Sequence, residues 1–175
     1  MKWPTGLSYD DILLIPQYLD IRSRQEVILD SPLNENITLR LPIISSPMDT
    51  VTEAAMASQM SQCGGLGIVH RYNTIAQQVK IVKNIHKAAQ YGCALGIRGD
   101  FIERAQELYL HGARIFCLDV AHGHHIMMKE ALKEIKKLFQ GFDIHIMAGN
   151  VATKHGFEDL ANWGADSIRC NIGGG

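Results

Sequence analysis

Apolar and polar positions follow one another in repeating blocks from about residue 42 onward. Each block holds a short apolar run, a polar turn, a segment with apolar residues three and four apart, and then a glycine. Continuous apolar runs are typical of parallel strands buried on both faces, and the second spacing is typical of amphipathic helices. The pattern predicts strands at about 42–46, 65–70, 93–97, 114–119, 144–148 and 166–172, and helices at about 52–62, 75–91, 101–111, 126–139 and 154–163.

Polar residues stand where two of the predicted helices begin. Asn73 or Thr74 precedes the second helix, and Asp100 precedes the third. Side-chain oxygens at this position accept hydrogen bonds from backbone N–H groups of the first helical turn. These residues are therefore predicted to be helix N-caps.

The repeat predicts an α/β fold built from βα units, because strand follows strand at roughly 20 to 30 residues with a helix between. A closed TIM (β/α)8 barrel needs eight strands and roughly 250 residues. The 175 residues are therefore predicted to contain about the first six βα units of such a barrel. The rival is an open doubly wound sheet, which usually carries a GxGxxG loop after its first strand; this chain has Ser-Pro-Met-Asp-Thr at 46–50.

Two regions are expected within this frame. Residues 1–41 are predicted to form an N-terminal arm, with one or two short strands, that packs on the barrel. Residues 42–175 are predicted to be the N-terminal part of a single catalytic domain.

Charge and composition exclude several classes of partner. The net charge of −1 gives no overall field toward nucleic acid or an anionic membrane. No apolar stretch reaches the roughly 18 residues of a membrane span, and the first six residues lack a signal-peptide run. The four cysteines form no CxxC pair and lie in or beside apolar runs, which favours buried free thiols in a cytoplasmic protein.

Polar residues gather at the carboxyl ends of the predicted strands, where parallel barrels place their active sites. The strand interiors stay apolar, so one functional face is predicted. The residues at these ends are Ser45, Ser46, Met48, Asp49, His70, Arg71, Arg98, Asp119, His122, His124, His125, Asn150 and Asn171.

Two of these residues have a chemistry that suits a nucleotide. The carboxylate of Asp119 can accept hydrogen bonds from a sugar diol, although it could instead cap the following helix. Asn150 offers a donor and an acceptor for a base or a ribose, although it could instead be a turn residue. Arg169 and Asn171 alternate with Cys170, so they should face the other way; Arg169 could bind an anion, and Cys170 is predicted to be a core thiol.

Two further segments allow several interpretations. The loop His122-Gly123-His124-His125 could bind zinc together with His70 and Asp119, but ligands from one short loop rarely converge on one ion. A polar turn or a ligand-contact loop is therefore favoured. The glycines at 173–175 could hold a phosphate with amides or a monovalent cation with carbonyls, or they could form a flexible loop.

Six motifs follow one another along the chain in an order specific to one family. They are GLSYDDILLIP at 6–16, SSPMDTVTE at 45–53, GGLGIVHR at 64–71, LDVAHGH at 118–124, MAGNVAT at 147–153 and IGGG at 172–175. Over essentially its whole length the chain resembles the IMP dehydrogenase/GMP reductase family. The resemblance implies a TIM barrel that usually assembles as a homotetramer.

The resemblance also implies a covalent mechanism. In this family a cysteine shortly after the glycine run attacks C2 of the purine nucleotide, and a hydride passes to or from a nicotinamide cofactor. IMP dehydrogenase then hydrolyses the thioimidate to XMP, whereas GMP reductase expels ammonia from GMP to form IMP. No cysteine of the 175 residues occupies this place, and the nucleophile is expected just after Gly175.

The matching motif positions imply three groups of binding residues. Ser46, Met48 and Asn150 should contact the purine nucleotide. Backbone carbonyls of Gly173 and Gly175 should hold a potassium ion. Asp119 should bind the nicotinamide-side ribose of the cofactor, which is NAD or alternatively NADP. The other cofactor-binding residues should be Val120, Ala121, Asn171, Ile172 and Gly173.

The motifs divide between the two reactions. The residues at 9–11 and 51–53 look more like those of dehydrogenases, whereas the residues at 23–27 and the missing pair of regulatory CBS domains look more like reductases. The prediction is an NAD-dependent IMP dehydrogenase without CBS domains. An NADPH-dependent GMP reductase is the alternative, and a non-catalytic purine-nucleotide-binding protein is a distant one.

Overall fold

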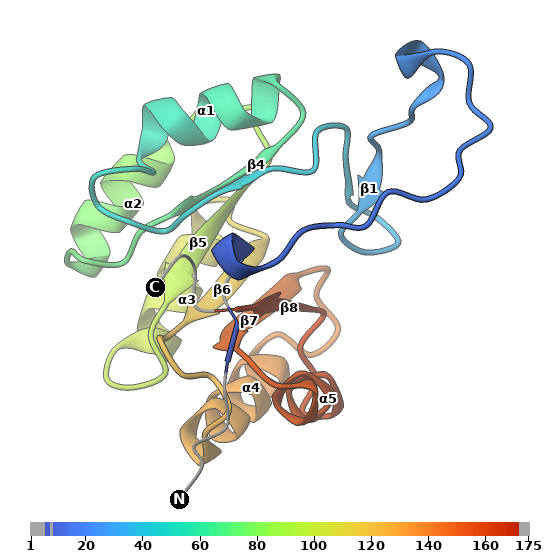
Figure 1. Cartoon of the computed structure of the whole chain (residues 1–175). Helices are drawn as coiled ribbons and strands as arrows, with labels where there is room; N and C mark the ends of the chain where they lie inside the picture. The colour runs from blue at the N-terminus through green and yellow to red at the C-terminus, as the bar shows by residue number, and fades with distance from the viewer. Residues whose placement is uncertain (1–5, 8, 172–175) are drawn as a thin grey trace, which may run out of the picture.

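A computed structural model describes residues 6–7 and 9–171, in which a curled six-stranded parallel sheet carries helices on its outer face (Figure 1). No helix in this described part is long and apolar enough to cross a membrane. The strands are β3 (Ile44–Ser45), β4 (Leu66–Val69), β5 (Tyr91–Leu95), β6 (Ile115–Asp119), β7 (His145–Val151) and β8 (Ser167–Cys170), and the helices are α1 (Ala54–Gln62), α2 (Ile75–Lys83), α3 (Phe101–Leu110), α4 (Ile126–Leu138) and α5 (Lys154–Asn162).

The strand order confirms the barrel and excludes the doubly wound sheet. Strands β3 to β8 pair in the order of the chain, and each pair is parallel. A doubly wound sheet reverses its strand order at a switch point, whereas a TIM barrel adds each strand beside the last. The described part therefore has the architecture of six consecutive strands of a TIM barrel with the five helices between them.

Alternate side chains of β4 to β7 enter two separate apolar clusters. Val69 of β4 packs in the outer cluster between the sheet and its helices, while Leu66 and Ile68 of the same strand pack in the inner cluster. Because both faces are buried, the strands carry the continuous apolar runs seen in the sequence. The buried residues of the inner cluster are Leu39, Leu66, Ile68, Ala94, Ile115, Cys117 and Met147.

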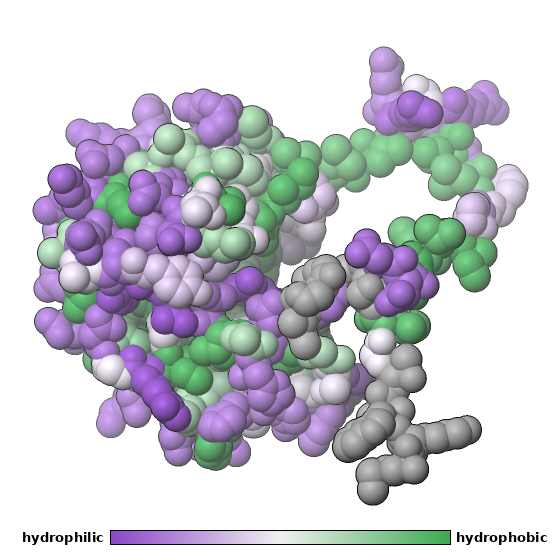
Figure 2. All heavy atoms as spheres, turned by 60° about the vertical axis from the view of Figure 1, so that its left-hand side comes forward, coloured by the Kyte–Doolittle hydropathy of each residue, from purple (hydrophilic) through white to green (hydrophobic). Residues whose placement is uncertain are grey.

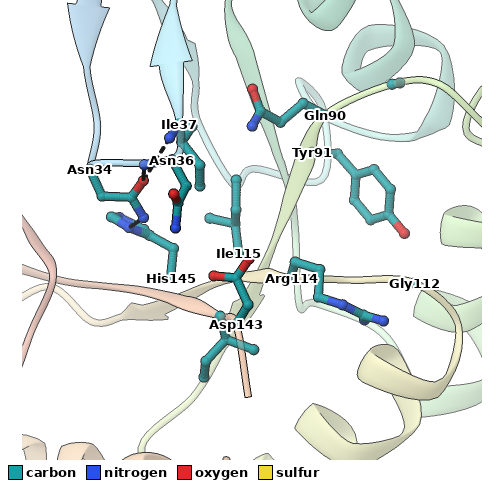
Figure 3. A pocket seen from close by; sticks show the side chains of 12 residues that line it. Asn34, Asn36, Ile37, Gln90, Tyr91, Gly112, Arg114, Ile115, Asp143 and His145 are labelled. Carbon is teal, nitrogen blue, oxygen red and sulfur yellow. Dashed lines mark hydrogen bonds between the residues drawn. The ribbon is translucent and has the colours of Figure 1, made fainter. Parts of the chain in front are cut away.

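A short antiparallel hairpin covers the inner cluster, in agreement with the strands predicted before residue 42. It consists of β1 (Ser31–Pro32) and β2 (Thr38–Leu39), and Leu39 is 4% exposed. Beneath the hairpin a hollow of about 320 Å³ opens toward the start of β5, β6 and β7, with Asn34, Arg114 and His145 around it (Figure 3). This end of a barrel contributes to stability rather than to catalysis, so the hollow is not the predicted active site.

The described segment before the hairpin, residues 10–30, is exposed to solvent along its whole length. These residues form an extended segment that leaves the body of the molecule (Figure 2). Leu13 and Leu14 are 94% and 97% exposed. Among the described residues of the arm, Leu39 of the hairpin is the one buried in the inner cluster, and Leu33 and Ile37 pack against it.

Hydrogen bonds from α1 change one predicted boundary. Helix α2 ends at Lys83 rather than near Gly92, and β5 already begins at Tyr91. The Ser58 hydroxyl accepts a hydrogen bond from the His86 N–H at 3.0 Å, and the Ser61 hydroxyl accepts one from the Gln90 N–H at 2.8 Å. These bonds hold the segment after α2 against α1 in a non-helical path.

The two predicted N-caps have different outcomes. Thr74 caps α2 and forms a reciprocal capping box with Gln77. Asp100 makes no side-chain cap bond to α3, because its carboxylate pairs with Arg104 at 2.6 Å. The buried Arg104 guanidinium also donates to Gln78 Oε1 at 2.8 Å, so this carboxylate is held by an internal network instead of the helix end.

The prediction of four buried thiols is correct for two of them. Cys93 and Cys117 are buried, and burial raises the pKa of the Cys117 thiol to about 11. Cys63 ends α1 and is exposed. Cys170 is also exposed rather than a core thiol, because β8 is the edge strand of the described sheet.

His145 joins the hairpin to the sheet and should make stability depend on pH. Its Nδ1 lies 2.9 Å from the Asn34 amide nitrogen, and its Nε2 lies 2.8 Å from the Ser167 hydroxyl. The Asn34 amide nitrogen can only donate, so the neutral ring accepts at Nδ1. Burial lowers the pKa of His145 below its ordinary value of 6.5; Asp166 opposes this shift and Lys136 adds to it.

We expect the free energy of unfolding to fall as the pH drops below about 6.5. Below this pH His145 is protonated in the unfolded state and still neutral in the folded state. The stabilisation by neutral His145 is therefore fully present above pH 6.5 and is lost as the pH falls through the lower pKa of the folded state. Urea unfolding at about pH 7.5 and about pH 5 measures the difference. His145→Gln keeps the hydrogen bonds but cannot titrate, and an unchanged pH dependence in this variant would contradict the assignment.

Candidate active site

A hollow of about 280 Å³ lies at the carboxyl ends of β3, β6, β7 and β8, where a TIM barrel carries its active site. Six of the predicted binding residues line it together: Ser46, Met48, Asp119, Val120, Ala121 and Asn150. Pro47, Arg71, Tyr72 and Arg169 complete the wall. Residues separated by about 100 positions in the sequence therefore meet at one surface.

The turn after β3 holds Ser46 and Met48 in place through Thr52. Thr52 is fully buried, and its hydroxyl donates to the Ser46 carbonyl at 2.6 Å and lies 2.9 Å from the Ser45 hydroxyl. The Thr52 N–H in turn donates to the Met48 carbonyl at 3.0 Å. The turn is thus fixed by its own hydrogen bonds, while the Met48 side chain remains 50% exposed to the hollow and solvent.

Asp119 forms an ion pair with Arg169 across the inner side of β6 and β8. Their side chains are 13% and 27% exposed, and both residues lie beside Gly149 of β7 in the sheet. Asp119 is not the N-cap of the next helix, because the His125 side chain caps α4. A largely buried carboxylate with one edge open to the hollow can accept two hydrogen bonds from a diol.

Asn150 lies within β7 and is not the turn residue considered above. Its backbone N–H donates to the Val120 carbonyl at 2.8 Å, and its carbonyl accepts from the Gly123 N–H at 2.7 Å. Its side-chain nitrogen donates to the Asn171 carbonyl at 2.8 Å. These bonds orient the amide and tie the loops after β6 and β8 to the edge of the hollow.

Arg71 belongs to the site, although sequence reasoning gave it no role. Its Nη2 donates to the Asp119 carbonyl at 3.0 Å. Its buried Nε has no hydrogen-bond partner among the described residues. A buried unpaired N–H is costly, so this guanidinium is suited to an acceptor group of a ligand. Its place at the end of the second strand was the signal in the sequence.

The zinc set considered for the histidine loop is not formed. His70 lies 3.3 Å from Glu53, and Asp119 pairs with Arg169. His125 caps α4, whereas His124 turns away from the hollow to Asp159 of α5. The loop therefore does not converge with His70 and Asp119 on one ion.

Part of the predicted cofactor site and the predicted potassium site fall outside the described residues. These are Ile172, Gly173 and Gly175. Asn171 is described, and it adopts a positive φ of 77°, which asparagine tolerates better than most residues. The binding roles of all these residues stay predictions.

The fold and the hollow together define a TIM-barrel protein with a polar site at the carboxyl ends of its strands. Residues 6–175 match the IMP dehydrogenase / GMP reductase domain, and the chain belongs to this family of oxidoreductases.

Similar proteins carry both names. The chain is 33% identical over 214 residues to the inosine-5'-monophosphate dehydrogenase of Cryptosporidium parvum, covering 97% of this chain and 52% of that protein. It is 31% identical over 170 residues to the GMP reductase of Variovorax paradoxus, covering 95% and 51%. The crystal structure of inosine 5' monophosphate dehydrogenase from Legionella pneumophila superimposes with a TM-score of 0.85 at 37% identity, covering 96% of this chain and 51% of that one. The chain thus spans about half the length of each.

Proposed function

We propose that the protein containing this chain is an IMP dehydrogenase, which oxidises IMP to XMP with NAD⁺ through a cysteine thioimidate. The observation that carries the proposal is the meeting of Ser46, Met48, Asp119 and Asn150 at one hollow. The matched family and the dehydrogenase structure that superimposes on the chain support it. The nucleophilic cysteine is expected beyond Gly175.

The described residues fit a nucleotide and a diol-bearing cofactor. The cofactor would supply the hydride acceptor, and the Asp119 carboxylate would accept hydrogen bonds from its ribose diol. Asn150, Ser46 and the Met48 region would bind and orient the purine nucleotide. The unpaired Nε of Arg71 would donate to an acceptor at the same edge. Potassium binding by Gly173 and Gly175 remains a prediction.

GMP reductase is the second candidate, and one similarity favours it. The chain is 44% identical over 88 residues to the GMP reductase of Leishmania donovani, although this covers 50% of the chain and 18% of that protein. Both reactions use the same nucleotide and cofactor surfaces. They differ in whether water adds to C2 or ammonia leaves it, and the residues that position the water or the ammonia are expected beyond Gly175.

Absorbance at the reduced-nicotinamide band distinguishes the candidates. The full-length gene product is given IMP with NAD⁺ in one cuvette and GMP with NADPH in another. A rise in the first supports the dehydrogenase, and a fall in the second supports the reductase. No absorbance change in either cuvette, with the loop cysteine confirmed in the gene, would contradict both reactions. It would favour a protein that only binds purine nucleotides.

Asn150→Ala should raise the KM for the nucleotide about tenfold, because one or two neutral hydrogen bonds are lost. The Asn171 carbonyl also loses its amide partner, so part of the effect reflects the position of the loop after β8. Steady-state kinetics at saturating cofactor measure the change. Lys133→Ala, on the far helix α4, is the matched surface control. A nucleotide KM within twofold of the parent protein would remove Asn150 from the nucleotide site.

The resemblance also leads us to propose a cytoplasmic homotetramer. Light scattering coupled to size-exclusion chromatography of the full-length protein measures the assembly. A mass of one chain over the working concentration range would contradict it.

A further inference from the structure

A cluster of three metal-ligand side chains lies outside the hollow. His124, in the loop after β6, meets His155 and Asp159, which lie four residues apart on one face of α5. The His124 Nε2 is 2.9 Å from Asp159 Oδ2, and the His155 Nε2 is 3.7 Å from the same oxygen. One possible ligand atom from each residue lies within 4.8 Å of the other two.

These separations suit a small transition-metal ion. Tetrahedral zinc binds nitrogen and oxygen at about 2.0–2.2 Å, which places its ligand atoms roughly 3.3–3.5 Å apart. The two Nε2–Oδ2 separations of 2.9 Å and 3.7 Å differ from this by about 0.6 Å or less, which side-chain rotation can correct. His155 is 76% exposed, so its ring has room to rotate toward the other two ligands.

The surrounding fold holds the other two ligands. A Cβ on Gly156 would lie 3.3 Å from His124 Cβ, so the glycine lets this histidine approach the first turn of α5 closely. The His124 ring also lies 5.9 Å from the Trp163 ring at the end of the same helix. The side chains of His124 and Asp159 are 28% and 29% exposed, which shelters them without closing the site.

We propose that His124, His155 and Asp159 bind a divalent transition-metal ion of the zinc class. Two neutral imidazoles and one carboxylate form a common zinc ligand set, and a fourth position stays open to water. The ion would fasten the loop after β6 to α5. Because Gly123 of that loop donates to the Asn150 carbonyl at 2.7 Å, the ion would also restrain the edge of the hollow.

This site is separate from the proposed reaction. Its ligands are not among the residues that line the hollow, and no step of nucleotide oxidation needs them. A protein inactive in both absorbance assays could still bind the ion, and an active dehydrogenase could lack it.

The test is a metal titration of the full-length protein after treatment with a chelator. Zn²⁺ binding is measured by calorimetry, and the visible absorption of bound Co²⁺ reports tetrahedral coordination. The parent protein should bind one ion that His155→Ala and Asp159→Asn lose, with an affinity reduced at least about 100-fold. Zn²⁺ should raise the Tm of the parent protein and leave that of His155→Ala unchanged.

Two variants are matched controls. His122→Ala removes an imidazole from the same loop, and Glu158→Gln removes a carboxylate from the same helix; both should keep the parent affinity. His155 is exposed, so its variant should fold even if changes at His124 do not. No zinc binding by the parent protein, equal affinity in His155→Ala, or equal loss in the controls would each overturn the site.

Discussion

Replacing Gly67 with valine should lower the free energy of unfolding by about 3 kcal/mol or more. A Cβ at this position of β4 would lie 2.6 Å from the Cα of Ala57, which is fully buried in α1. The contact is with helix backbone, so no side-chain rotation can relieve it. The helix would have to move, together with the turn that holds Ser46. Urea unfolding monitored by circular dichroism measures the loss.

The size of the substituent provides an internal check. Gly67→Ala should also destabilise, although alanine in a strand normally stabilises relative to glycine by about 0.5–1 kcal/mol. Gly6→Val is the matched control, because a Cβ there meets nothing within 4 Å. Equal stability of Gly67→Val and the parent protein would mean that α1 does not rest directly on β4.

Asp119→Ala should reduce kcat/KM for the cofactor about 100-fold and leave the nucleotide KM within about twofold, provided that the proposed function is correct. Two charge-assisted hydrogen bonds to a ribose diol at about 1.5 kcal/mol each give about 3 kcal/mol, or about 100-fold. Initial rates at varied NAD⁺ and saturating IMP measure the cofactor effect, and the reverse arrangement measures the nucleotide effect.

Arg169→Met separates binding from structure. It breaks the same ion pair but keeps the Asp119 carboxylate, so its cofactor loss should be smaller than that of Asp119→Ala. Asp119→Ala leaves the partly buried guanidinium of Arg169 without its carboxylate partner, and the resulting loss of stability is measured as a lower Tm. Equal losses for cofactor and nucleotide in both variants, with equal falls in Tm, would make Asp119 a structural partner of Arg169 only.

The sequence predicted the fold well where one physical rule controls the pattern. Strands buried on both faces must be apolar throughout, so β4 to β7 were recognisable from short apolar runs. Boundaries were less certain where side chains from another element decide them. The end of α2 depends on the hydroxyls of Ser58 and Ser61, which no local pattern around residue 84 reveals.

The site was predictable in part for the same reason. Parallel strands bring their carboxyl ends to one edge, so the positions of Ser46, Asp119 and Asn150 followed from strand order alone. The pairing of Asp119 with Arg169 did not, because it depends on which side chains of β6 and β8 face each other across β7. The helix-cap and turn alternatives for Asp119 and Asn150 were removed only by the observed hydrogen bonds.

The sequence by itself determined the βα repeat, the family motifs and the face on which polar residues gather, because these depend on local periodicity and chain order. The tertiary structure decided the contacts between distant segments. It buried the unpaired Nε of the partly exposed Arg71, brought His124 to His155 and Asp159, and left residues 10–30 exposed. Such contacts depend on the packing of separate elements, where each side chain meets partners that its sequence neighbours do not specify.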